Sequence, residues 1–150
     1  MTAFDEEFLL GVYASTREAE LANVGWDDAQ IRAFVSMQHR AQSADYRERF
    51  PKADYSVIVL SGRPIGRLWV DRHTDEIRIL DVTVLPRHQG QGVGTLLIKE
   101  LQAEARHADV PLRDSVLINN PRAEALYRRL GFVQIGENGM YRSMEWAAEP

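Results

Sequence analysis

The sequence contains no cysteine, no long apolar run, no cluster of basic residues and no low-complexity tract. The absence of cysteine excludes disulfides and thiolate chemistry, and it fits a reducing compartment. No apolar stretch approaches the roughly 20 residues that a membrane helix needs, so we expect no membrane partner. The N-terminal residues MTAFDEEF are acidic and lead into no signal-peptide pattern, which favours a cytoplasmic location.

Positive charge is outweighed by negative charge, with a formal net charge of -4 at pH 7. Because the Lys and Arg residues are scattered along the chain, we predict no nucleic-acid partner. An acidic protein attracts cations such as amines over long range, although mild acidity also serves solubility alone. We predict no metal site.

The length of 150 residues suits one domain, which at this size buries roughly two thirds of the surface of its unfolded chain. Hydrophobic residues make up 45% of the chain and charged residues 27%, as in ordinary globular proteins. We find no internal repeat and no linker, so we treat residues 1–150 as a single domain.

Periodic patterns predict the secondary structure. Apolar residues recur at helical spacing from Glu6 to about Asn23. Asp27 suits the N-cap of a second helix that runs to about Phe50, where Pro51 ends it. The further elements are strands at Tyr55–Leu60, Ile65–Arg72 and Glu76–Leu85, a helix from Val93 to about Ala108, a strand at Ser115–Asn119, a helix at Ala123–Leu130, and a final hairpin of FVQI and MYRSMEW around a turn at Glu137–Gly139.

The segment QGQGVGT, from Gln89 to Thr95, lies between a predicted strand and a predicted helix. Its three glycines let the backbone approach a ligand closely, and the helix N-terminus adds positive electrostatic potential. Such a loop suits a phosphate or pyrophosphate. The same glycines also fit a plain tight turn. A Rossmann site and a P-loop fit poorly, because the spacing and the preceding antiparallel strands differ from theirs.

Two motifs in this order resemble the GNAT (GCN5-related N-acetyltransferase) superfamily. Gln89, Gly92 and Gly94 match its Q/R-x-x-G-x-G/A coenzyme motif. A second, independent match is N-x-x-A-x-x-L-Y-x-x-x-G-F, carried by Asn120, Ala123, Leu126, Tyr127, Gly131 and Phe132. The resemblance implies an α/β (α+β) fold with a mixed, mostly antiparallel central sheet, about four flanking helices, and two neighbouring strands splayed around acyl-CoA.

The resemblance also implies roles for particular residues. The residues expected around acetyl-CoA are Val82, Thr83, Val84, Gln89, Gly90, Gln91, Gly92, Val93, Gly94, Thr95, Asn120 and Tyr127. Tyr127 would be the general acid that protonates the departing sulfur, with a position in the helical core as its alternative. Asn120 is equally suited to beginning the helix that follows it. The backbone N–H of Val84 could stabilise the oxyanion.

The general base is not marked by the motifs. Related N-terminal acetyltransferases often have a glutamate five residues before the motif asparagine, where this chain has Ser115. We therefore expect a water chain assisted by Glu76, Asp81 or Asp114, although each of these could also be a solvated strand residue.

The resemblance places an acceptor pocket between the N-terminal helices and the sheet. Gln38, Gln42 and Tyr46 recur every four residues on the second helix, so this stripe either lines that pocket or faces solvent. His39, beside the stripe, is expected at the surface.

The predicted function is direct transfer of an acetyl group from acetyl-CoA to a primary amine of a small molecule or peptide. Without cysteine, a cysteine-linked acyl-enzyme is ruled out. Two alternatives remain: a noncatalytic acyl-CoA sensor, and an acyltransferase that uses a longer acyl-CoA. Members of the family often pair through their sheets or C-terminal strands, which leaves a homodimer open.

Overall fold

The computed structural model describes residues 3–15, 17 and 25–149. The helices are α1 (Ala3–Ser15), α3 (Asp28–Arg49), η1 (Pro86–His88, a 3₁₀ turn), α4 (Val93–Ala108) and α5 (Pro121–Arg129). The strands are β1 (Asp54–Leu60), β2 (Arg63–Arg72), β3 (Ile77–Val84), β4 (Leu112–Leu117), β5 (Val133–Asn138) and β6 (Tyr141–Trp146). The predicted order of helices and strands is confirmed.

The two N-terminal helices differ in how well their ends were predicted. Helix α3 begins as predicted: the Asp27 carboxylate accepts from the Gln30 N–H at 2.8 Å, and the Gln30 side chain accepts from the Asp27 N–H at 3.0 Å. The first helix ends at Ser15, earlier than the predicted Asn23. Most of the predicted remainder, residues 16 and 18–24, lies outside the described residues.

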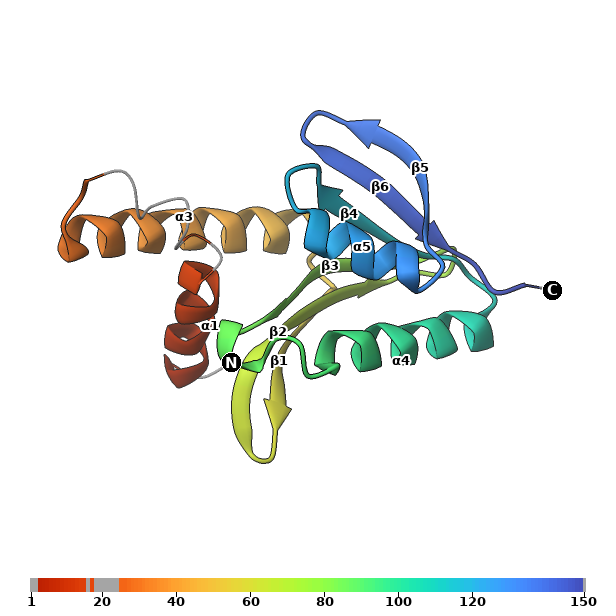
Figure 1. Ribbon diagram of the computed structural model, residues 1–150, viewed down its shortest axis with the longest axis horizontal. Helices are drawn as coiled ribbons and strands as arrows, with labels where there is room; N and C mark the ends of the chain where they lie inside the picture. The colour runs from red at the N-terminus through yellow and green to blue at the C-terminus, as the bar shows by residue number, and fades with distance from the viewer. Residues whose placement is uncertain (1–2, 16, 18–24, 150) are drawn as a thin grey trace.

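Six strands of the described residues form one sheet in the order β1-β2-β3-β4-β6-β5. Every neighbouring pair is antiparallel except β3 and β4, which are parallel. The expected mixed, mostly antiparallel sheet is therefore confirmed. Figure 1 shows α1 and α3 at one end of the molecule and the C-terminal hairpin β5–β6 at the other side of the sheet.

The two faces of the sheet carry different helices. Trp69 of β2 packs edge-on against Tyr46 of α3 at 5.5 Å between ring centroids. The next residue, Val70, points to the opposite face and joins a core with Ile98 and Leu101 of α4. Helices α1 and α3 therefore cover one face, and α4 and α5 cover the other. None of the described helices is long and apolar enough to cross a membrane.

Three predictions near the functional elements were wrong in detail. Strand β4 begins at Leu112 rather than Ser115, because the charged residues at its start are paired: Arg113 bonds Glu145 at 2.8 Å and Glu76 at 3.1 Å. The hairpin turn lies after Asn138, slightly later than predicted. His39 is 5% exposed, since its ring packs against Tyr13 at 5.5 Å.

Gly66 has the closest neighbours of any glycine in the described residues. It lies opposite Val84 of β3, and a Cβ added to it would be 2.2 Å from the carbonyl oxygen of Thr83 and 3.2 Å from Ile58 Cδ1. The contact with Thr83 is with backbone, which cannot move without displacing β3. Glycine at position 66 is therefore required for the pairing of β2 with β3.

Gly66→Ala is expected to lower the free energy of unfolding by about 3 kcal/mol, because overpacking against backbone forces the strands apart. Urea denaturation checks this. Gly11→Ala is the matched control: Gly11 lies in α1, and a Cβ added to it would have no described atom within 4 Å, so alanine there should raise stability by about 0.5–1 kcal/mol. Equal effects of the two substitutions would contradict the assignment.

Candidate active site

Strands β3 and β4 separate shortly after they begin to pair. Among the described residues their pairing runs from Ile77–Leu112 to Ile79–Asp114 and goes no further. Leu80 is an extra residue opposite β2, because Trp69 faces Asp81 while Val70 faces Ile79. This β-bulge bends β3 away from β4. The backbone of β3 from Leu80 onward therefore faces a gap.

The bulge also decides where Asp81 points. Ile77 and Ile79 face the core under α4 and α5, and strict alternation would send Asp81 to the same face. The extra residue Leu80 reverses the alternation, so Asp81 instead faces Arg67 on the side of α1 and α3. Bulges that redirect a side chain in this way are common beside active sites.

The backbone of Val84 points into the gap. The Leu85 N–H donates to the Ile65 carbonyl of β2 at 2.8 Å. In an antiparallel ladder alternate residues turn their polar groups to opposite sides, so the N–H and C=O of Val84 turn away from β2. The Gln89 side-chain amide donates to the Val84 carbonyl at 2.9 Å and also accepts from Arg122 at 2.7 Å. Gln89 thus ties the glycine segment to the end of β3.

The glycine segment forms an open turn that begins α4. Gly90 and Gly92 have φ of 77° and 81°, values that only glycine adopts at little cost. A Cβ at either position would have no described atom within 4 Å. Gly92 is the N-cap of α4, and no described side chain caps it. The first N–H groups of α4 are therefore available to an anion at the positive end of the helix.

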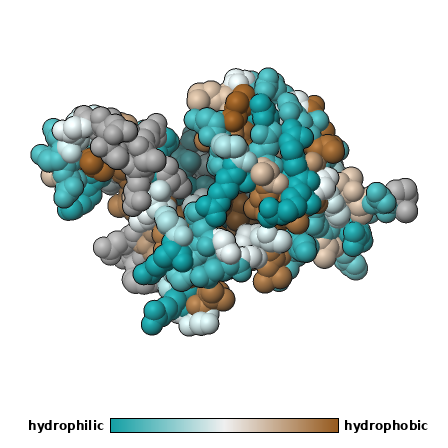
Figure 2. Space-filling view, in the orientation of Figure 1, coloured by the Kyte–Doolittle hydropathy of each residue, from teal (hydrophilic) through white to brown (hydrophobic). Residues whose placement is uncertain are grey.

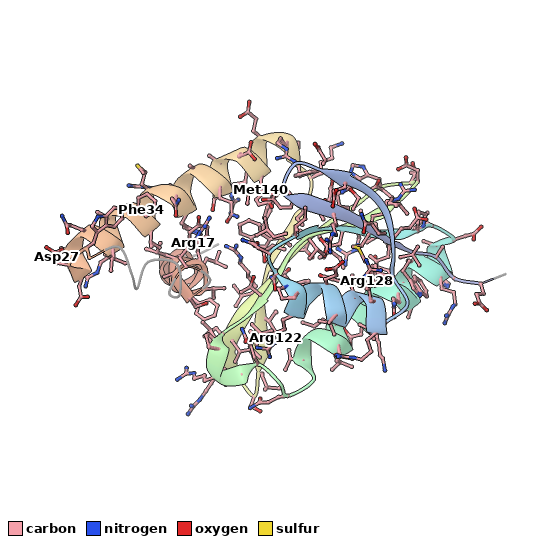
Figure 3. The ribbon with its side chains drawn as sticks, turned by 45° about the horizontal axis from the view of Figure 1, so that its top comes forward. Arg17, Asp27, Phe34, Arg122, Arg128 and Met140 are labelled. Atoms are coloured by element: carbon pink, nitrogen blue, oxygen red, sulfur yellow. The ribbon has the colours of Figure 1, made fainter. Side chains whose placement is uncertain are left out.

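A cavity of about 290 Å³ lies where β3 and β4 diverge. Residues from α1, α3, the sheet and α5 line it: Tyr13, Arg17, Gln42, Tyr46, Arg67, Leu80, Asp81, Val82, Thr83, Asp114, Ser115, Val116, Leu117, Asn120, Ala123, Tyr127 and Tyr141. In Figure 2 the surface is hollowed between the α1 and α3 end and the C-terminal hairpin. Figure 3 shows Arg17 beside this opening and Arg122 at the first turn of α5.

The polar stripe of α3 contributes to the cavity. Gln42 and Tyr46 line it, whereas Gln38 accepts a hydrogen bond from the Tyr13 hydroxyl at 3.4 Å. Burial, followed by the charge of Asp81, raises the pKa of Tyr46 to about 12. Tyr46 therefore presents a neutral hydroxyl to the cavity at any physiological pH. Of the two alternatives for the stripe, the pocket is the correct one for Gln42 and Tyr46.

Asp81 is held in place on the cavity wall. Arg67 Nη2 donates to Asp81 Oδ2 and to Gln42 Oε1, the latter at 3.2 Å. The Thr83 hydroxyl donates to Asp81 Oδ1 at 2.6 Å. The Arg67 guanidinium lies 4.4 Å from the centroid of the Trp69 ring. With its side chain 15% exposed, Asp81 keeps a small face open to the cavity.

Asp114 and Tyr127 form a second, more deeply buried group. Both are less than 7% exposed, and the Tyr127 hydroxyl hydrogen-bonds the Asp114 carboxylate. Asp114 Oδ1 also accepts from the Ser115 N–H at 2.7 Å. Burial raises the pKa of Asp114 to about 7, although these two hydrogen bonds oppose the shift. Burial and then the charge of Asp114 raise the pKa of Tyr127 well above its ordinary value.

Glu76 lies away from this cavity. Its carboxylate pairs with Arg78 at 2.9 Å and Arg113 at 3.1 Å, just before β3. Burial opposes ionisation of Glu76, but the hydrogen bonds and charges of the two arginines outweigh it and keep its pKa below the ordinary value. The structure thus brings together Asp81 and Asp114, but not Glu76, among the carboxylates considered as bases.

Asn120 begins α5, as one of its two predicted roles requires, and it also lies at the cavity. Its side-chain oxygen accepts from the Ala123 N–H at 3.2 Å, which caps α5, and the residue also lines the cavity. Arg67, Tyr13 and Tyr141 line the cavity as well, and sequence reasoning did not single them out. For Arg67 a signal existed, because an arginine flanked by apolar residues in a central strand is rarely buried unless a partner such as Asp81 pairs with it.

Comparison with known proteins places these features in a family. The sequence model of a family described as an acetyltransferase (GNAT) domain matches residues 51–134, more than half of the chain. This protein belongs to the GNAT acetyltransferase family. The match includes the glycine segment and also β3 and α5, which line the cavity. No curated protein matches the sequence.

Solved structures of GNAT proteins share the fold. The PaiA N-acetyltransferase of Thermoplasma acidophilum, in complex with coenzyme A, superposes with a TM-score of 0.73 at 14% identity and covers 99% of this chain and 96% of its own. A GNAT family acetyltransferase of Elizabethkingia anophelis with acetyl-CoA bound gives 0.60 at 16%, covering 71% and 84%. The ribosomal-protein-alanine N-acetyltransferase of Brucella melitensis gives 0.60 at 24%, covering 99% and 97%.

The geometry of this GNAT chain fits a coenzyme A thioester. The uncapped start of α4, with open space at Gly90 and Gly92, suits a pyrophosphate. The gap beside Val84 leaves backbone groups for an extended, amide-containing arm. The gap opens on the cavity that holds Asp81 and Tyr127, and Gln89 joins the glycine segment to the end of β3. The described residues include no cluster of His, Asp and Glu side chains that could hold a metal ion.

Asp114 should make stability depend on pH. Its folded-state pKa is about 7 against an ordinary value of 3.8, so the stability that its neutral form contributes is complete below pH 3.8 and is lost as pH rises to 7. From pH 4 to pH 8, wild type should lose several kcal/mol of unfolding free energy relative to Asp114→Asn, since each pKa unit is worth about 1.4 kcal/mol. Urea denaturation at both pH values measures this difference.

The control for this prediction is Asp75→Asn, the same substitution at an exposed turn. Its difference from wild type should stay constant between the two pH values. A constant difference for Asp114→Asn as well would show that this carboxyl is not shifted.

Proposed function

We propose that this GNAT protein is an enzyme that transfers an acetyl group from acetyl-CoA to a primary amine of a small molecule or peptide, directly and in a ternary complex. The observation that carries the proposal is the gap between β3 and β4, which opens on the cavity with its two carboxylates and Tyr127 and to which Gln89 joins the glycine segment. The structures of relatives that hold coenzyme A or acetyl-CoA support the choice of acyl donor.

In this proposal the coenzyme lies along the splayed strand. Backbone groups of Val82 and Val84 bind the pantetheine arm, whereas those of Thr83 turn toward β2 as those of Leu85 do. Asn120 contacts the arm from the end of β4. The amides of Gly90–Thr95 bind the pyrophosphate at the start of α4. Acetyl-CoA supplies a thioester whose carbonyl carbon accepts the amine and whose sulfur departs.

Asp81 is the proton acceptor in the proposed mechanism. An alkylamine has a pKa of about 10 and is almost fully protonated at neutral pH, so a base has to remove a proton before attack. Asp81 has an open face toward the cavity and its carboxylate is fixed by Arg67 and Thr83. It takes the ammonium proton, directly or through one water, and the neutral amine then bonds the carbonyl carbon.

The remaining two steps use Val84 and Tyr127. The Val84 N–H, which turns away from β2, stabilises negative charge on the thioester oxygen. The Tyr127 hydroxyl gives its proton to the sulfur as the carbon–sulfur bond breaks. The nitrogen still carries two hydrogens after attack, and it gives one of them to water, which leaves a neutral amide. The full sequence lacks cysteine, so the acetyl group passes to the amine without a cysteine-bound intermediate.

Release of free CoA from acetyl-CoA in the presence of an amine library tests the proposal. Tyr127→Phe should lower kcat at least about 100-fold, because general acid catalysis contributes 100-fold or more. Its affinity for CoA, measured by calorimetry, should stay near the wild-type value. The deleted hydroxyl also contacts Asp114, so thermal unfolding of the variant has to show that it remains folded.

Other outcomes would identify the alternatives. Tight binding of acetyl-CoA without turnover of any amine would indicate a sensor. Turnover with succinyl-CoA or a fatty acyl-CoA in preference to acetyl-CoA would indicate a longer acyl donor. An unchanged kcat in Tyr127→Phe would remove Tyr127 from the mechanism.

Gly92→Ala should weaken CoA binding about tenfold, equivalent to about 1.4 kcal/mol. Alanine is strained at φ of 81°, and its Cβ enters the open space at the start of α4. Gly139→Ala is the matched control, because Gly139 has φ of 60°, equally open surroundings, and a position in the β5–β6 turn. Calorimetry with CoA compares them, and an equal loss in both variants would contradict a phosphate site at Gly92.

A further inference from the structure

Asp114 and Tyr127 line the same cavity and their side chains interact, yet only Tyr127 has a role in the mechanism so far. Asp114 alternates with Leu112 and Val116 on the face of β4 that packs under α5. It is 6% exposed and Tyr127 is 3% exposed, and both reach the cavity wall. The Ser115 N–H holds one carboxylate oxygen at 2.7 Å. The Ser115 N–H therefore fixes the carboxyl at the part of the cavity that Tyr127 also lines.

The groups around Asp114 come from three neighbouring elements, β3, β6 and α5. Across the sheet it faces Ile79 of β3 on one side and Met144 of β6 on the other, both uncharged. From α5 it faces Tyr127, and two charged residues of β3 act on it: Asp81 opposes its ionisation and Arg78 favours it. Among the described residues, no cationic side chain is hydrogen-bonded to the Asp114 carboxyl.

The protonation state of Asp114 determines which way the Tyr127 hydrogen points. When Asp114 is a carboxylate it can only accept, so the Tyr127 O–H donates to it and its hydrogen is turned away from the cavity. When Asp114 is protonated, its own O–H can donate to the Tyr127 oxygen. The hydroxyl hydrogen of Tyr127 is then released to donate into the cavity.

We propose that Asp114 is a positioning residue that sets the direction of the Tyr127 hydroxyl and resupplies its proton. This inference rests on the proposed function. It assigns Asp114 to the support of the general acid Tyr127 rather than to the role of general base. As the nitrogen–carbon bond forms and the carbon–sulfur bond breaks, the Tyr127 proton goes to the sulfur and the Asp114 proton goes to the Tyr127 oxygen. Asp114, left as a carboxylate, regains a proton from water after CoA leaves.

The two carboxylates of the cavity then have opposite tasks. Asp81, fixed by Arg67, accepts the proton of the amine, while Asp114 resupplies the proton that Tyr127 donates. Burial raises the pKa of Asp114 to about 7, so the donating form is present below that pH and is lost as pH rises through it. If Asp114 were instead the base, activity would increase through the same range.

Carbon-13 NMR on the free enzyme tests the coupling without any acceptor. Protein labelled at tyrosine Cζ and aspartate Cγ is titrated from pH 5 to pH 9, and Tyr127→Phe assigns the Tyr127 signal. We expect the Asp114 Cγ and Tyr127 Cζ signals to shift with one common midpoint near pH 7. In Asp114→Asn the Tyr127 shift should disappear, and in the exposed control Asp75→Asn it should persist. A Tyr127 signal in wild type that does not move between pH 5 and 9 overturns the proposal.

The pH dependence of kcat, with saturating acetyl-CoA and an amine found in the library assay, provides the second measurement. We expect wild-type kcat to fall about tenfold per pH unit above pH 7, and this alkaline limb to be absent in Asp114→Asn, whose amide donates to Tyr127 at every pH. A limb that persists in Asp114→Asn, or a kcat that increases through pH 7, contradicts the proposal. Absence of turnover would refute the proposed function alone, since the NMR titration does not depend on it.

Discussion

The early end of the ladder between β3 and β4 is the constraint on which the site depends. The strands pair as far as Ile79 and Asp114, and the extra residue Leu80 then bends β3 away. The unpaired backbone beyond this point has to bond something other than a neighbouring strand, because buried amide groups are rarely left unsatisfied. Gln89 already satisfies the carbonyl of Val84. The remaining edge is open to an extended ligand, and the cavity lies at its inner end.

The same bulge places the two carboxylates of the cavity on opposite faces of the sheet. By reversing the alternation of β3 it places Asp81 on the face of Arg67, whereas Asp114 on β4 faces α5 and Tyr127. One carboxylate is thus fixed by a guanidinium, and the other is buried without one. Two residues of one type acquire different chemistry from their surroundings, which is a common way for a site to hold an acid and a base together at neutral pH.

The glycine segment is a site whose properties are largely local. Gly90 and Gly92 adopt left-handed conformations, and α4 begins directly after them without a side-chain cap among the described residues. Spacing along the chain was sufficient to predict this, because the turn, the helix start and the exposed N–H groups all arise within a few residues. The Asp27 capping box of α3 was predictable for the same reason.

The sequence by itself determined the order of helices and strands, the glycine turn before α4 and the likeness to GNAT proteins, since each of these depends on contiguous residues. Tertiary structure alone decided which carboxylates reach the cavity. The bulge at Leu80, the burial of His39, the pairing of Glu76 with Arg113 and the contact of Asp114 with Tyr127 each join residues that are distant in sequence or depend on strand register. Register and burial are set by how the whole sheet packs, and a shift of one residue sends a side chain to the opposite face.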